Sequence, residues 1–281
     1  MMVPEEISMI VSSDPKAGAI NRSTDGSYFE IQLQDGLQLP AEALNVNIAV
    51  EEATIWWVVP NIISGENDTM YITGPDTLDV VQNYVVVIPQ GLYDLSGINQ
   101  AILRDLENQG AKIDPDPLIT LTPDEPTQKV EMRFDYATVS VDFTQPNTPR
   151  DILGFNSQVL GPYVGAPVNI LADNIAQFNQ VNYFLIHSDL TNKGIRFNNN
   201  YNQTIAQVLI DVSPGSQIVS HPFNPAKINA PELAGAKRTN LRIWLTDDQD
   251  RRVNTNGEYF TARIVIHYLK PYVIGHQSLR M

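Results

Sequence analysis

Cysteine is absent from the 281-residue sequence, which excludes a disulfide framework, a thiolate nucleophile and a cysteine-based zinc site. Charged residues are also scarce, at 18% of the chain, so the surface must rely on Asn, Gln, Ser and Thr. Such a surface is typical of proteins that bury much of it against neighbouring chains, because charged residues are depleted at interface cores. Monomeric β proteins can share this composition, which favours an oligomer without requiring one.

Basic residues are few relative to acidic ones. The sequence has 18 Lys and Arg against 32 Asp and Glu, a formal net charge of −14. An acidic chain repels phosphates, and the basic pairs at 237–238 and 251–252 are isolated. We therefore expect no direct contact with nucleic acid.

Long apolar runs are missing as well. The longest, at 55–60 and 84–89, are far too short to span a bilayer. The first 16 residues contain early acids and no apolar core, so no secretory signal is expected.

Alternating apolar and polar residues, typical of half-buried strands, run through most of the chain. Phe29, Ile31 and Leu33 alternate with polar residues. Three strands are expected before residue 81 and four clear ones after residue 165, with a fifth candidate at 217–220. Eight strands in two antiparallel sheets predict a mainly β fold, an eight-stranded jelly-roll β-sandwich. The other expected strands lie at 46–59, 70–72, 181–187, 204–212, 239–246 and 259–269.

One segment is strongly helical in this otherwise β sequence. Ile98, Ile102 and Leu106 recur every four residues and form one apolar stripe. Ser96 is the expected N-cap, and Gly110 has the position of a left-handed C-terminal residue. Strands are expected around this helix at 84–88, 119–122, 129–134 and 138–143, with a short helix at 150–153 ended by Gly154.

The helical segment predicts a discontinuous domain organisation. We expect an N-terminal arm at 1–27 and a jelly-roll base formed by 28–80 and 165–281. An inserted α+β module at 81–164 would then carry one helix near 97–108. The module would lie between the third and fourth strands of the base.

Histidines offer no metal-ligand pattern. His187, His221, His267 and His276 include no pair two or four residues apart. A metal enzyme of the cupin type needs closely spaced histidines with a carboxylate nearby. His187 and His267 fall in expected strands that are far apart in the sequence, so ordinary imidazoles are favoured over ligands.

Acidic clusters do not indicate a site either. Residues 247–250 resemble the start of a calcium loop, but Arg252 occupies a position that needs an oxygen ligand. A hairpin loop with a turn at Asn256-Gly257 is favoured. Glu51 and Glu52 point to opposite faces of a strand and cannot form a catalytic carboxylate pair. The sequence thus predicts no catalytic, cofactor-binding or metal-binding residues and no cofactor.

Trp56 and Trp57 are the most conspicuous aromatic pair. On a strand their rings face opposite sides. We expect one ring in the core, and the other on the second face or against a partner.

Six motifs in a fixed order resemble the penton, or minor capsid, proteins of Polinton-like viruses and virophages. The resemblance covers residues 28–270, and its specificity lies in the order and spacing of the motifs. They are IWWVVPNI at 55–62, YVVVIPQGLYDL at 84–95, VSVDF at 139–143, RDILGF at 150–155, LIHSDL at 185–190 and LTDDQDRRVNTNGEYF at 245–260.

The resemblance implies a structural protein at the fivefold vertices of an icosahedral double-stranded DNA virus. It implies a homopentamer among trimers of the major capsid protein, in a capsid shell assembled inside the host cell. The module would face outward, where a host receptor could contact it, and contact with an internal membrane stays open. Two alternatives are a receptor-binding spike and a single-jelly-roll major capsid protein. An enzyme is not expected.

Overall fold

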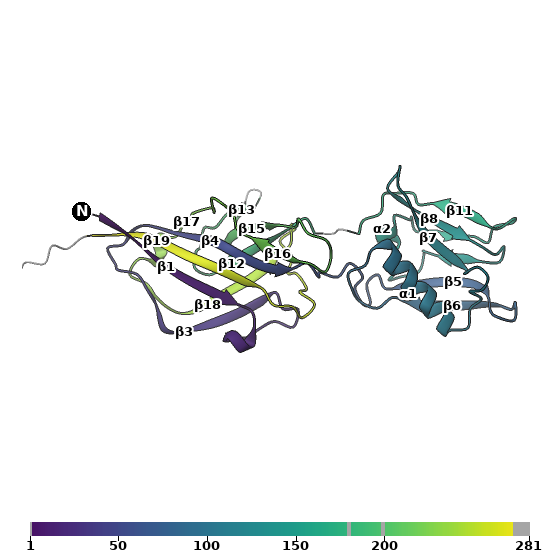
Figure 1. Cartoon of the computed structure of the whole chain (residues 1–281), viewed down its shortest axis with the longest axis horizontal. Coiled ribbons are helices and arrows are strands. Elements are labelled where there is room, and N and C mark those ends of the chain that lie inside the picture. Colours follow the sequence, from purple (N-terminus) through teal and green to yellow (C-terminus); the bar gives the residue numbers. More distant parts are fainter. Residues whose placement is uncertain (1, 179–180, 198–199, 272–281) are drawn as a thin grey trace, which may run out of the picture. The chain divides into compact units, whose positions relative to one another are not determined.

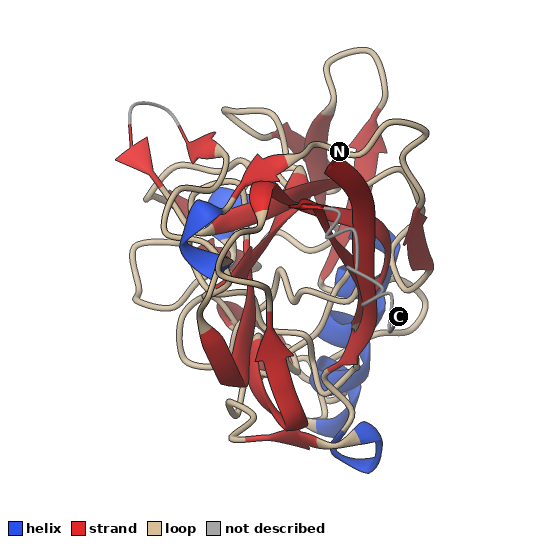
Figure 2. Ribbon diagram, turned by 90° about the vertical axis from the view of Figure 1, so that its left-hand side faces the viewer, coloured by secondary structure: helices blue, strands red, loops and turns tan. Residues whose placement is uncertain are grey.

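The computed structural model describes residues 2–178, 181–197 and 200–271. The chain divides into two compact units. Unit 1 comprises Met1–Val58 and Val181–Met281, and unit 2 comprises Val59–Gln180. Both consist mainly of antiparallel strands (Figures 1 and 2), so the prediction of a mainly β chain is confirmed. No helix among the described residues is long and apolar enough to cross a membrane.

Unit 1 contains two five-stranded antiparallel sheets. In the first, called sheet A, the order is β1, β19, β4, β16. Strand β17 pairs with an earlier part of β4, on the same edge as β16. In the second, called sheet B, the order is β15, β12, β18, β3, β2. The bounds in sheet A are β1 Met2–Ser12, β4 Leu44–Trp56, β16 Gln217–Ser220, β17 Ile228–Asn229 and β19 Thr261–Pro271. Those in sheet B are β2 Ala19–Ile20, β3 Tyr28–Gln38, β12 Tyr183–Ser188, β15 Thr204–Leu209 and β18 Lys237–Thr246.

Three smaller features complete unit 1. They are the 3₁₀ helices η1 (Pro15–Ala17) and η2 (Pro231–Leu233) and a hairpin of β13 (Arg196–Phe197) and β14 (Asn200–Tyr201).

The core of unit 1 follows from the alternation within its strands. Ile48 and Ile55 of β4 are buried, as is Ile266 of β19. Trp57 is buried and packs edge-on against Phe184 at 6.0 Å, whereas Trp56 is 36% exposed. The two tryptophans therefore face opposite ways, as the sequence predicted. Burying a side chain of the size of isoleucine or phenylalanine stabilises the fold by about 1.5–3 kcal/mol.

The predicted N-terminal arm at 1–27 is wrong over its first half. Met2–Ser12 is strand β1, paired with β19 along its whole length. Pro4 and two glutamates make the segment read as irregular, and Ile10 points outward. Both features weaken the alternation that would have identified a strand.

Unit 2 contains two smaller antiparallel sheets and two helices. One sheet has the order β10, β9, β5, β6, and the other has β11, β8, β7. The strands are β5 Thr69–Pro75, β6 Val81–Val87, β7 Ile119–Asp124, β8 Lys129–Phe134, β9 Ser140–Asp142, β10 Val159–Leu160 and β11 Val168–Leu171. The helices are α1 Leu95–Asn108 and α2 Arg150–Leu153.

Helix α1 buries the predicted stripe in the core of unit 2. Ile98, Ile102 and Leu106 have no exposed surface and pack with residues of both sheets. The N-cap is Asp94, whose carboxylate accepts a hydrogen bond from the Gly97 amide at 2.6 Å. The predicted N-cap, Ser96, lies inside the helix instead. Asp and Ser are both good caps, and Asp94 lies two residues before Ser96.

The structure also corrects the predicted limits of the insert, 81–164. Strand β5 pairs with β6 and β9, and its Met70 and Ile72 belong to the core of unit 2. Strand β11 pairs with β8. Unit 2 therefore begins at Val59 and ends at Gln180. The strand expected at 70–72 belongs to unit 2 and not to the base.

Candidate functional surfaces

His187 lies in the interior of unit 1, where its surroundings keep it neutral. The imidazole has no exposed surface and stacks on Trp244, with ring centroids 5.3 Å apart. Nε2 lies 2.7 Å from Oγ1 of Thr246, and Nδ1 lies 3.2 Å from Oγ1 of Thr204. Burial lowers the pKa of His187 to about 4, although Asp250, 3.6 Å from Nε2, favours the charged form. A buried imidazole with both nitrogens hydrogen-bonded has a structural role.

The other histidines do not join His187. His267 is on β19, with Nδ1 3.7 Å from Oε2 of Glu6, and His221 is exposed. His276 lies outside the described residues. Within the described part of the chain, no three His, Asp or Glu residues are grouped so that they could hold a metal ion.

The acidic segment at 247–250 forms a turn tied to its own backbone. Oδ1 of the buried Asp247 accepts hydrogen bonds from the amides of Gln249 and Arg251, each at 2.9 Å. Its Oδ2 pairs with the Arg251 guanidinium at 2.7 Å. The carboxylate that would begin a calcium loop is thus occupied by protein donors.

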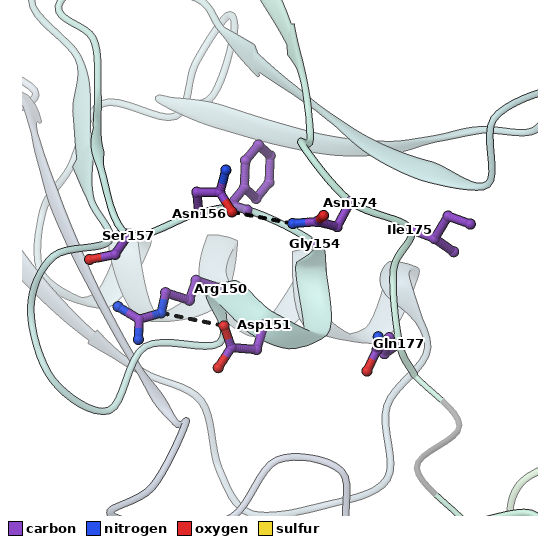
Figure 3. A pocket seen from close by; sticks show the side chains of 9 residues that line it. Arg150, Asp151, Gly154, Asn156, Ser157, Asn174, Ile175 and Gln177 are labelled. Carbon is purple, nitrogen blue, oxygen red and sulfur yellow. Dashed lines mark hydrogen bonds and ion pairs between the residues drawn. The ribbon is translucent and has the colours of Figure 1, made fainter.

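A polar pocket of about 310 Å³ lies in unit 2 beside α2 (Figure 3). Gly154 ends α2 with φ 83°. There is no room for a side chain at this position, because a Cβ there would meet the Asn174 carbonyl oxygen at 2.3 Å. This close approach holds the loop at 172–177 against α2. The side-chain amide of Asn174 donates a hydrogen bond to Oδ1 of Asn156 at 3.3 Å across the pocket. The side chains around the opening are Arg150, Asp151, Asn156, Ser157, Asn174 and Gln177.

Helix α1 covers the edge of β6. Oδ2 of Asp105 accepts a hydrogen bond from the Val87 amide at 2.9 Å, and the Gln109 side chain donates to the Val85 carbonyl at 2.9 Å. These side chains replace a neighbouring strand. Covered edges resist pairing with other chains, so this end of the sheet is closed.

The edges of sheet A carry exposed apolar side chains. On the β1 edge, Ile10 is 78% exposed. On the opposite edge, Val219 of β16 is 61% exposed and Phe223, in the loop between β16 and β17, is fully exposed. Trp56, next to β16 on β4, adds to this second edge. The β16 edge and the loop after it thus carry several exposed apolar side chains.

Comparisons with known proteins give a resemblance in structure but none in sequence. No protein-family model matches the sequence, and no curated protein matches it. The chain is similar to the crystal structure of the mavirus penton protein, with a TM-score of 0.49 and 10% sequence identity. The aligned region covers 95% of this chain and 100% of the mavirus chain.

Proposed function

We propose that unit 1 is an eight-stranded jelly roll. Its eight main strands in chain order are β1, β3, β4, β12, β15, β16, β18 and β19. Sheet A then contains the first, eighth, third and sixth of them, and sheet B contains the second, seventh, fourth and fifth. Two four-stranded sheets linked by such crossovers are the double Greek key of a jelly roll. Unit 2 enters this jelly roll between the third strand, β4, and the fourth, β12.

The function that these features support best is that of a structural capsid protein. More finely, we propose the penton at the fivefold vertices of an icosahedral double-stranded DNA virus. It would be a homopentamer in the capsid shell, next to trimers of the major capsid protein. The observation that carries the proposal is the jelly-roll strand order interrupted once, after β4, by a separate folded unit. A fold alone does not specify a function, and the ordered motifs described above supply the link to capsid vertices.

A receptor-binding role is the second candidate, and the pocket beside α2 favours it. Its amide, guanidinium and carboxylate groups can hydrogen-bond to hydroxyl groups of a glycan. Gln177 and Ser157 add further polar side chains to the lining of this pocket. Binding of labelled oligosaccharides that a Gln177→Ala substitution abolishes would support this role, which a penton can also fulfil.

The experiment that tests the capsid proposal combines the native mass of the purified chain with its location in particles. A penton should form pentamers of about 157 kDa, five times the 31.3 kDa chain. It should also co-purify with virions and occupy their fivefold vertices in particle images. A stable monomer absent from every virion fraction would refute the proposal. Occupation of the capsid faces in many copies would instead indicate a major capsid protein.

A further inference from the structure

We propose that the two edges of sheet A bind each other between neighbouring copies of this chain, the β1 edge of one copy against the β16–β17 edge of the next. This inference rests on the proposed function, because it assigns the lateral contact of the ring. It follows from the registers of sheet A, the exposed side chains on each edge and the distribution of charge.

The β1 edge is only half protected. Strand β1 pairs with β19, and its other side has no partner strand among the described residues. Pro4 and the adjacent glutamates disfavour further pairing along the first half. The second half, 7–12, reads ISMIVS and has neither charge nor proline. An uncharged edge of this length with an exposed Ile10 is prone to association.

The sheet registers place matching groups on the two edges at the same level. One row across the sheet runs from Glu6 through His267 and Asn47 to Asn229 of β17. A second row runs from Ser12 through β19 and β4 to Val219 of β16. The loop that joins β16 to β17 therefore spans the levels between these rows.

Chemically complementary groups lie at or near these levels. Lys227 immediately precedes β17 and is exposed, and the registers place it two residues from the level of Glu6 on the other edge. Phe223 lies in the connecting loop, between the two rows, and Ile10 lies between the same rows on β1. A rotation about an axis parallel to the strands keeps every residue at its level. The acidic group of one copy would then meet the basic group of the next, and Ile10 would meet Phe223.

Strand direction agrees with this contact. Each neighbour in sheet A is antiparallel, so β1 and β16 run in opposite directions. In a rotational ring, β1 of one copy therefore lies antiparallel to β16 of the next. Contacts between two different edges are heterologous, and heterologous contacts form a closed ring when the rotation between copies closes on itself.

The charge distribution favours a second copy over a partner of opposite charge at this surface. Unit 2 contains 5 basic and 16 acidic residues, a net charge of −11, whereas unit 1 contains 13 and 16, a net charge of −3. Unit 1 is thus almost neutral, and two copies of it can approach with little repulsion.

The test uses the full-length chain and mass photometry or sedimentation over a range of concentrations. Phe223→Asp should raise the concentration at which half of the chains are assembled by about tenfold or more, since it removes a central apolar contact. Because Phe223 is fully exposed, the fold should be unaffected, and tryptophan fluorescence checks this. Leu78→Asp is the matched control, because Leu78 is 80% exposed but lies in unit 2.

A charge exchange tests the pairing of the edges directly. Glu6→Lys and Lys227→Glu should each weaken assembly, and the double variant should restore it to within about threefold of the wild type. His267→Gln, which removes the neighbour of Glu6 within the chain, should leave the mass unchanged. Rings that form normally in all single variants overturn this inference and leave the capsid proposal standing. A wild-type chain that stays monomeric at its highest soluble concentration overturns both.

Discussion

Acidification should destabilise unit 1 through one buried side chain, His187. Folding removes this imidazole from water and stacks it on Trp244. Its pKa falls from 6.5 to about 4, mainly because of burial. Between these values the unfolded chain binds a proton that the folded chain does not. The stability is therefore fully present above pH 6.5 and is lost as the pH falls toward 4.

The size of the effect follows from the two pKa values. The full difference between the two pKa values corresponds to about 3 kcal/mol of unfolding free energy. At about pH 5 the unfolded imidazole is almost entirely protonated and the folded one almost entirely neutral, so about 2 kcal/mol is already lost. Asp189 acts in the opposite direction, because burial raises the pKa of its carboxyl. The comparison of variants at each pH isolates the contribution of His187.

Urea unfolding monitored by tryptophan fluorescence measures this loss in unit 1 alone. The three tryptophans, at positions 56, 57 and 244, all belong to unit 1. We expect His187→Gln to be less stable than the wild type near neutral pH but to change little between about pH 7 and 5. His221→Gln, which removes an exposed imidazole from the same unit, should keep the wild-type dependence of the unfolding free energy on pH.

Two results would refute this reasoning. If His187→Gln loses stability with acid as steeply as the wild type, other groups carry the pH dependence. If the wild type keeps its stability down to about pH 5, the imidazole is more accessible to protons than its packing indicates.

Three further predictions concern unit 2. Asp94→Ala should destabilise α1 by about 1 kcal/mol, whereas Ser96→Ala should change it by less than about 0.5 kcal/mol, as measured by hydrogen exchange across the helix. Gly154→Ala should lower the unfolding free energy by about 3 kcal/mol, because of backbone strain and the clash with the Asn174 carbonyl. Gly165→Ala, at φ 87° but with open space around it, should lower the unfolding free energy by only about 1 kcal/mol. Calorimetry of the two variants measures the difference. Asp105→Ala should make the β6 amide that it binds exchange about tenfold faster.

The eight strands that the sequence predicts for the base differ at two places from the strands of unit 1. Residues 2–12 show no clear alternation, so the sequence does not predict β1. Met70 and Ile72 alternate well, and β5 was therefore assigned to the base. The predicted set of eight therefore lacks β1 and includes β5, which belongs to unit 2. Alternation reveals that a strand has a buried face but not which core buries it, because that depends on long-range pairing.

Local signals predicted local structure better. The apolar stripe of α1, its end near Gly110 and the opposite orientations of Trp56 and Trp57 all follow from periodicities of a few residues. The proposed assembly edge could not be predicted in this way. Phe223 lies in a segment without periodicity, and its level relative to Ile10 is set by the registers of five strands.

The unequal charge of the two units bears on how such a chain can assemble. Interface formation brings surfaces to within a few ångströms, where the repulsion between like charges is weakly screened, while charges separated by more than about 10 Å are largely screened at moderate salt. A net charge of −11 on unit 2 would oppose close contact between copies of that unit. Unit 1, at −3, meets far less opposition. Its exposed Ile10, Val219 and Phe223 can therefore stabilise contacts between copies. The lower charge of unit 1 therefore favours it over unit 2 as the site of the proposed association.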